Sequence, residues 1–208
     1  MLDPDRLFPV EPRLRDTARA LYTQIKDLPI VSPHGHTDPA WYAQDEAFPN
    51  PADLFVKPDH YVFRMLYSQG VRLENLGLPR ADGAPVERDS RTIWRRFAER
   101  YHLFRGTPSK MWIDHALQDV FNWTTPLSAQ SADAAYDHIT ERLQRPDYRP
   151  RALYHSFNIE VIATTESPLD DLRHHKALAG WDGRVITTYR PDEVVDPDHP
   201  SFADNLVR

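Results

Sequence analysis

Two histidines separated by a single glycine, His34 and His36, lie in the stretch PIVSPHGHTDP. A short apolar run stands directly before them, so they are expected to follow a buried strand. Because alternate residues of a strand face the same side, both imidazoles would aim at one point and could bind one divalent ion. Gly35 leaves room for the ion or a substrate. The alternative is a polar turn holding two histidines that are hydrogen-bonded or solvated, and an H-x-H pair alone does not decide between them.

A second group of reactive side chains lies in the stretch DHYVFR, which is expected to begin a helix. His60 and Tyr61 are adjacent, and Arg64 follows one turn later, at a spacing that brings helix side chains together. A tyrosine hydroxyl near a cation gives up its proton more easily. Tyr61 could therefore transfer protons, and the alternative is that it packs in the core.

A third candidate, Arg190, follows the apolar run VITTY. An arginine at the carboxyl end of a strand can hold a carboxylate through two parallel hydrogen bonds. The alternative is a surface pair with Asp192, which would contribute little to stability.

The elements that must position these residues follow from the apolar spacing and the helix signals. Strands are expected at residues 28–31, 159–165 and in the stretch RVITTYRPD, and residues 37–55 are expected to be a loop. Helix caps are expected at Ser90, Ser109, Ser131 and Ser167. Helices are expected at residues 13–26, 58–69, 91–104, 110–122, 132–144, 149–157 and 168–179, with the first turns of another at 201–208.

The alternation of strands and helices predicts an α/β fold with a parallel sheet. A closed (β/α)₈ or TIM barrel needs eight strands and about 250 residues, so the chain is expected to hold an incomplete barrel with its first three strands. A long helical insertion would separate strands one and two. The expected division is residues 1–36 (first helix and strand), 37–157 (mostly helical insertion) and 158–208 (second and third strands).

Composition narrows the class of protein. The 208 residues include no Cys, which excludes disulfides and thiolate metal sites and leaves His, Asp or Glu to hold any metal, with zinc as the candidate. The net charge is -6 at pH 7, and no basic stripe indicates nucleic acid. The charged N-terminus does not look like a secretory signal, and no apolar run predicts a membrane span. A cytoplasmic enzyme is expected.

The motifs together resemble one family. PIVSPHGHTDP, FPNPADLFVKPDHYVFRMLYSQGV, FNIEVIATTESPLDDLRHH and YRPD occur in the order typical of uronate (glucuronate) isomerases, amidohydrolase-like barrel enzymes that bind a metal. The resemblance covers nearly the whole chain. It implies isomerisation of D-glucuronate to D-fructuronate and of D-galacturonate to D-tagaturonate through an enediol.

The resemblance also implies roles for residues. His34 and His36 would bind a divalent metal, Tyr61 would transfer the proton, His60 would contact the substrate, and Arg190 would bind the hexuronate carboxylate. Glu166 is a candidate supporting acid where the family usually carries Asp. His174 and His175 are interpreted as surface and packing residues, because neighbouring helix residues face different ways.

Members of this family are much longer, so the remaining site residues are expected beyond residue 208. The isolated chain is therefore expected to be inactive unless a second chain completes it, and a homo-oligomer is a further possibility. Two other functions stay open. One is a metal-dependent hydrolase on the same barrel, and the other is a non-catalytic helical binding module built from residues 58–157.

Overall fold

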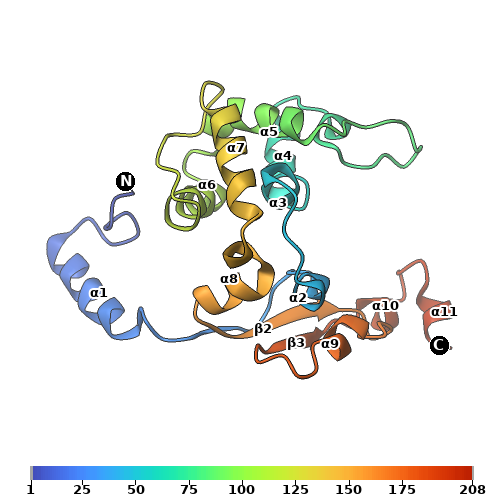
Figure 1. Ribbon diagram of the computed structural model, residues 1–208. Coiled ribbons are helices and arrows are strands. Elements are labelled where there is room, and N and C mark those ends of the chain that lie inside the picture. The colour runs from blue at the N-terminus through green and yellow to red at the C-terminus, as the bar shows by residue number, and fades with distance from the viewer. Residues whose placement is uncertain (1, 208) are drawn as a thin grey trace. The chain divides into compact units, whose positions relative to one another are not determined.

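Three parallel strands form one sheet in the order β1-β2-β3, with bounds β1 (Ile30–Ser32), β2 (Ile159–Glu166) and β3 (Val185–Tyr189) (Figure 1). The computed structural model describes residues 2–207. The predicted α/β class and parallel sheet are confirmed, and so is the long helical block between the first two strands. Because the strands are parallel, their carboxyl ends meet at one edge of the sheet, where the candidate residues follow β1 and β3.

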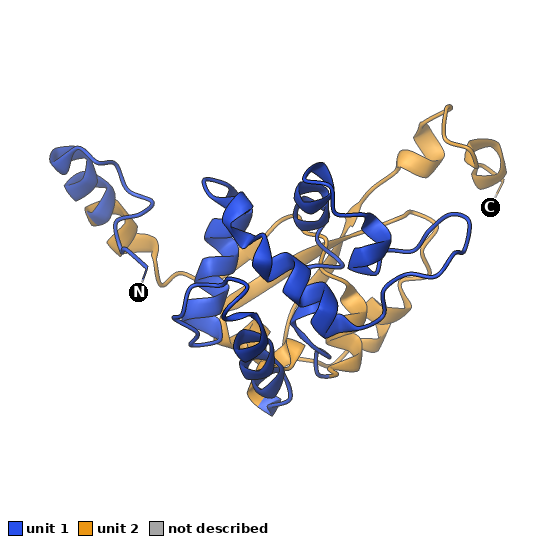
Figure 2. Cartoon of the chain, turned by 90° about the horizontal axis from the view of Figure 1, so that it is seen from above, with its two compact units in different colours: residues 1–19, 47–146 blue, residues 20–46, 147–208 orange. Residues whose placement is uncertain are grey.

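The chain divides into two compact units (Figure 2). Unit 1 contains residues 1–19 and 47–146, and unit 2 contains residues 20–46 and 147–208. These bounds differ from the three segments expected from the sequence, and that division stays a prediction.

Unit 2 contains the sheet and short helices. Its core cluster joins Tyr42, Tyr154, Ile162 and Leu178, with the ring of Trp181 stacked on Tyr42 at a centroid distance of 6.0 Å. The central run of β2 is buried on both faces, as expected for β-branched residues in a covered parallel strand. The helices of this unit are α2 (Pro39–Gln44), α8 (Pro150–Ser156), α9 (Arg173–Ala177), α10 (Asp192–Val195) and α11 (Phe202–Asn205).

Unit 1 is helical. Its core is built on the apolar face of α5, where Ile93, Trp94 and Phe97 are fully buried. The α-helices are α3 (Pro51–Phe55), α4 (His60–Ser68), α5 (Ser90–Glu99), α6 (Pro108–His115) and α7 (Ala132–Leu143). Short 3-10 turns occur at Leu73–Leu76 and Tyr101–Phe104, and a π-helical turn occurs at Ala116–Val120. A further 3-10 turn, Pro146–Tyr148, follows α7, and α1 (Pro12–Ile25) precedes β1.

Several helix starts differ from the prediction. Asp89, not Ser90, caps α5, because its carboxylate accepts the backbone N–H groups of Arg91 and Thr92. Thr107, not Ser109, caps α6, and Pro108 takes the first position, where no donor is needed. Ser131 precedes α7 as expected, but its hydroxyl donates to the carbonyl of Pro126 at 2.7 Å instead of capping.

The helices predicted at residues 91–104 and 110–122 are each interrupted. After α5 the backbone N–H of Arg100 donates to Phe97 O, three residues back, and a 3-10 turn follows that buries Tyr101 and Phe104. After α6 the chain widens into the π-helical turn, where Phe121 N donates to Ala116 O at 3.0 Å. The predictions at residues 13–26, 132–144 and 149–157 are confirmed within two residues as α1, α7 and α8.

The loop predicted at residues 37–55 is wrong in two places. Asp38 and Asn50 cap α2 and α3, and Pro39 and Pro51 occupy the first helical positions. The Asp-Pro and Asn-Pro pairs therefore begin helices here instead of marking turns.

The helix predicted after β2 is much shorter than expected, because α9 begins only at Arg173. The hydroxyl of Ser167 and the carboxylates of Asp170 and Asp171 accept backbone N–H groups two residues ahead of each, in local turns that replace helical bonds. Leu172, at φ 54°, then sets the start of the helix.

The prediction that β1 is buried is also wrong. Ile30 is 50% exposed and Val31 is 58% exposed. Within residues 2–207, this strand lies at the edge of the sheet and pairs with β2 on one side, with an irregular register between Ile30 and Val31. Among residues 2–207, no helix is long and apolar enough to span a bilayer.

Candidate functional site

The loop that follows β1 brings the two histidines together. The Nε2 atoms of His34 and His36 lie 3.3 Å apart, and the two ring planes are nearly perpendicular, at 86°. Both residues are exposed. The 3.3 Å contact is itself of hydrogen-bonding length, so the two side chains converge in a way that suits both a hydrogen-bonded turn and a shared metal ion.

This geometry fits the two histidines as ligands of one metal ion. Two nitrogens bound to one tetrahedral zinc at about 2.0–2.1 Å lie about 3.3 Å from each other, which is the separation observed. Within residues 2–207, no cluster of three or more His, Asp or Glu side chains suited to a metal occurs. The chain thus supplies two converging imidazoles, whereas a catalytic zinc commonly has three protein ligands.

The carboxyl end of β2 carries a buried polar group that the sequence interpretation missed. Of the two histidines interpreted as surface and packing residues, His175 packs inside: its side chain is 13% exposed, and its Nε2 lies 2.9 Å from the hydroxyl of Thr164. That hydroxyl donates its single hydrogen to the carbonyl of Ile186 at 3.2 Å, so Nε2 of His175 is the donor toward Thr164.

Glu166 joins the same group. Its side chain is 8% exposed, and its Oε2 lies 3.7 Å from Nε2 of His175 without a hydrogen-bond partner. Thr164 and Glu166 lie two residues apart and share one face of β2. That polar alternation is the signal from which the contact with α9 could have been predicted. The carboxylate of Glu166 thus lies close to His175 of α9, and its role as a supporting acid stays a prediction.

In unit 1, His60 and Tyr61 form the first turn of α4. The carboxylate of Asp59 caps this helix and accepts the backbone N–H of Tyr61 at 2.8 Å. Tyr61 is 60% exposed, and its ring centroid lies 4.2 Å from that of His60. The interpretation of Tyr61 as a core residue is wrong, because Val62 and Leu66 form the buried face of this helix. Its hydroxyl is therefore accessible for proton transfer.

Arg190 directly follows β3, whose last residue, Tyr189, is in register with Glu166 at the end of β2. Its Nε donates to a carboxylate oxygen of Asp192 at 2.9 Å, and both side chains are more than half exposed. The hydrogen bond from Arg190 lowers the pKa of Asp192. The surface pair considered from the sequence is present, while the remaining guanidinium nitrogens are accessible for an anion.

Comparison with known proteins extends these observations. A family model described as "UxaC: Glucuronate isomerase" matches residues 13–208. Uronate isomerase of Rhizobium meliloti is 62% identical over 208 residues, covering 99% of this chain and 44% of that relative. A uronate isomerase of Xanthomonas euvesicatoria is 59% identical with the same coverage. This chain thus spans less than half the length of these curated relatives.

Solved structures give the same result. The crystal structure of glucuronate isomerase from Caulobacter crescentus matches with a TM-score of 0.93 and 50% identity, over 98% of this chain and 43% of that one. The uronate isomerase of Thermotoga maritima matches with a TM-score of 0.86 and 25% identity, over 100% of this chain and 43% of that one. The three-stranded α/β arrangement is therefore that of these structures.

Proposed function

The chain belongs to the glucuronate isomerase family, and from this premise we propose that it supplies part of the active site of a uronate isomerase. The substrates are hexuronates, D-glucuronate and D-galacturonate, and the products are D-fructuronate and D-tagaturonate. One observation carries the proposal: the 3.3 Å separation of the Nε2 atoms of His34 and His36, at the carboxyl end of a parallel strand. Active sites of parallel barrels lie at that end.

We further propose that the sheet is the opening part of an amidohydrolase-like (β/α)₈ barrel, and that His34 and His36 hold a divalent metal, with zinc as the candidate. The donor set supports this, since two imidazole nitrogens suit zinc and the chain contains no Cys to offer a thiolate. When bound, the metal would polarise substrate oxygens. The expected cytoplasmic location stays part of this proposal.

Residues of this chain would carry out the proton transfer and bind the substrate. Aldose–ketose isomerisation moves a proton between C2 and C1 through an enediol, so a side chain must take the proton and return it. Tyr61 takes this role in the proposal, and its exposure at a capped helix start supports it. The ring of His60 lies beside that of Tyr61, tilted by 35°, and His60 contacts the substrate in this proposal.

Arg190 holds the carboxylate that distinguishes a uronate from a neutral sugar. Its guanidinium is 56% exposed after β3 and uses Nε on Asp192, which leaves the terminal nitrogens for the bidentate contact that a carboxylate favours. Asp192 fixes the orientation of the guanidinium plane and so prepares this contact.

The experiment that tests the proposal compares two tyrosines of α4 in a polypeptide that contains residues 1–208 and extends over the length of the relatives. Tyr61→Phe is expected to lower kcat for glucuronate isomerisation by about 10²–10⁴-fold, the usual contribution of a general acid–base group. Tyr67→Phe is the matched control, since Tyr67 is 61% exposed on the same helix. Equal activity of the two variants would exclude Tyr61 as the proton carrier.

The same assay separates the other functions considered. A hydrolase would cleave an activated ester and leave glucuronate unchanged, and a binding module would do neither. The 208-residue chain alone is expected to be inactive, and fructuronate formation by the purified chain would contradict that expectation.

A further inference from the structure

Two threonine hydroxyls, one from each of the neighbouring strands, hold the loop that carries the histidines. Thr165 of β2 donates from Oγ1 to the carbonyl oxygen of Gly35 at 2.8 Å, across 130 residues of sequence. Gly35 stands between His34 and His36, so this bond fixes the middle of the motif. The carbonyl of Gly35 belongs to the peptide group that enters His36, and its orientation sets the direction in which the His36 side chain leaves the backbone.

The second hydroxyl acts on the other side of His34. Thr188 of β3 is the register partner of Thr165, so the two side chains face the same side of the sheet. Its Oγ1 donates to the carbonyl oxygen of Pro33 at 3.4 Å. Hydrogen bonds from two strands therefore reach the backbone both before and after His34.

The loop depends on these side chains because the strand itself ends too early to hold it. The pairing of β1 with β2 stops at Ser32, which is the partner of Ile162. Beyond that residue, the hydroxyl of Thr165 makes the shortest hydrogen bond that ties the motif to the sheet. A neutral hydroxyl–carbonyl bond restricts the backbone without adding charge near the imidazoles.

We propose that Thr165, assisted by Thr188, is a positioning residue that sets the separation of the two imidazole Nε2 atoms and thereby their affinity for a divalent cation. This inference rests on the proposed function of His34 and His36. Groups that orient metal ligands typically change affinity by about 10- to 100-fold when removed.

The test uses the 208-residue chain and three variants. Thr165→Val removes the hydroxyl at nearly constant volume, and Thr165→Ser keeps it. Thr187→Val is the matched control, because Thr187 lies on β3 next to Thr188, is exposed, and its hydroxyl donates to the carbonyl of Thr188 at 3.4 Å. If the valine variant fails to fold, Thr165→Ala removes the hydroxyl without adding a second methyl group.

Two measurements are made on each variant. Calorimetric titration with Zn²⁺ is expected to give at least about 10-fold weaker binding for Thr165→Val, with affinity restored in Thr165→Ser and unchanged in Thr187→Val. The carbonyl ¹³C resonance of Gly35 is expected to move in Thr165→Val, because it loses its donor, and to stay near the wild-type position in the serine variant. Thermal midpoints record whether the fold itself has changed.

The two measurements separate failure of this inference from failure of the proposed function. If the wild-type chain and Thr165→Val bind Zn²⁺ equally well, or if the Gly35 resonance does not move, Thr165 does not position the motif. If the wild-type chain binds no Zn²⁺ while the Gly35 resonance still moves, the assignment of the metal to this pair is overturned and the role of Thr165 in holding the loop is supported.

Discussion

Arg151 at the start of α8 donates from Nε to the carbonyl oxygen of Tyr42 in α2, at a distance of 2.7 Å. Its Nη2 reaches the carbonyl of Ala43 at 3.3 Å, and its guanidinium lies 5.2 Å from the ring centroid of Trp181. The last carbonyls of a helix have no partner within the helix. The guanidinium of Arg151 therefore donates to the last carbonyls of α2, and it links this helix to α8 and to the aromatic core of unit 2.

Replacing this cation should destabilise the protein. Arg151→Ala is expected to lower the free energy of unfolding by about 2–3 kcal/mol, since hydrogen bonds to a charged group are lost and the carbonyls of α2 remain partly buried. Urea denaturation measures this change. Arg149→Ala is the control, because Arg149 is exposed and makes no side-chain cap, and it should stay within about 0.5 kcal/mol of wild type. Equal losses in both variants would contradict the role of Arg151.

The buried hydroxyl of Tyr42 is expected to make the protein less stable at alkaline pH. Burial raises the pKa of Tyr42 to about 12, against a hydrogen bond with Thr37 that lowers it. Below pH of about 10 the hydroxyl is protonated in both folded and unfolded chains. Above that pH the unfolded chain releases the proton and the folded chain keeps it, so the unfolded state gains stability. Between pH values of about 10 and 12, the titration of Tyr42 should therefore lower the free energy of unfolding by about 1.4 kcal/mol per pH unit.

Denaturation curves at a series of alkaline pH values measure this slope. The free energy of unfolding of Tyr42→Phe should decrease less steeply with pH than that of wild type, because the variant has no proton to release at this position. Burial also raises the pKa of Tyr101, with the hydrogen bond to Asp114 adding to the effect, so a residual slope is expected in the variant. An unchanged slope would show that Tyr42 does not contribute.

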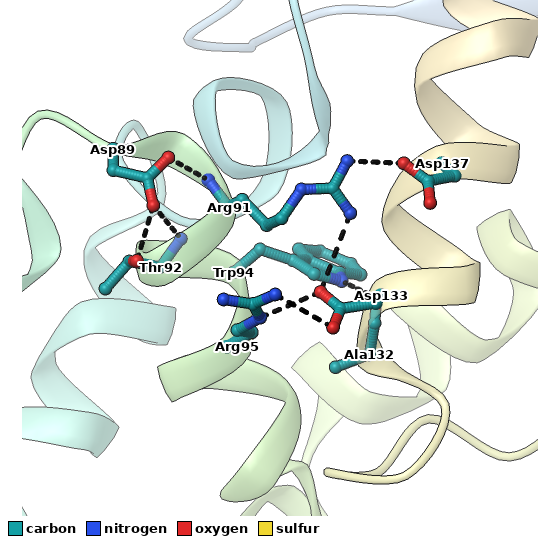
Figure 3. Close-up of polar contacts among 8 residues, drawn as sticks. All are labelled: Asp89, Arg91, Thr92, Trp94, Arg95, Ala132, Asp133 and Asp137. Carbon is teal, nitrogen blue, oxygen red and sulfur yellow. Dashed lines mark hydrogen bonds and ion pairs between the residues drawn. The ribbon is translucent and has the colours of Figure 1, made fainter.

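Contacts between α5 and α7 combine a buried hydrogen bond with exposed ion pairs (Figure 3). The indole Nε1 of Trp94, which is fully buried, donates to the carbonyl of Ala132 at 2.9 Å. Arg95 pairs with Asp133 at 2.8 Å and Arg91 pairs with Asp137, all on the exposed side. The buried bond should dominate, because exposed ion pairs are screened by water and salt.

Trp94→Phe is therefore expected to cost about 2–4 kcal/mol through lost volume and the loss of a buried hydrogen bond. Asp133→Asn should have a smaller effect, and that effect should disappear in about 1 M NaCl, where the Debye length is about 3 Å. Urea denaturation at low and high salt measures both. An Asp133→Asn effect that matched Trp94→Phe, or that persisted in high salt, would show that the ion pairs dominate.

Two glycines with positive φ provide a matched test of backbone strain. Gly70 (φ +85°) and Gly77 (φ +79°) both need a conformation that costs other residues about 1–2 kcal/mol. A Cβ at Gly70 would meet nothing within 4 Å, whereas at Gly77 it would lie 2.9 Å from Cδ1 of Ile93 and 3.1 Å from the carbonyl of Glu87. Gly70→Ala should therefore cost about 1–2 kcal/mol and Gly77→Ala about 3 kcal/mol or more. Thermal denaturation measures the loss of stability in each variant, and a larger loss for Gly70→Ala would show that the contacts around Gly77 do not add to the backbone strain.

Local patterns in the sequence predicted most of the fold. The β-branched runs gave β2 and β3, and apolar spacing gave α1, α7 and α8. The misses have local causes: Asp38 and Asn50 act as caps before proline, and the side chains of Asp170 and Asp171 take the backbone donors that a longer α9 would have used.

The site was less predictable because its contacts join distant segments. The H-x-H spacing left open whether His34 and His36 converge, and the structure brings their rings together on the loop after β1, with one glycine between them. The contact of Glu166 with His175 and the bond from Thr165 to Gly35 depend on which face of β2 meets which element. A sequence taken one segment at a time contains no such information.

The length of chain between β1 and β2 has a consequence for the order of folding. Thr165 meets Gly35 across 130 residues, whereas Thr164 meets Ile186 across 22. Closing the longer loop costs about 1.5 kcal/mol more conformational entropy, if both behave as flexible chains. We therefore expect β2 and β3 to pair early and β1 to join them late. The histidine pair would then be among the last features of the molecule to assemble.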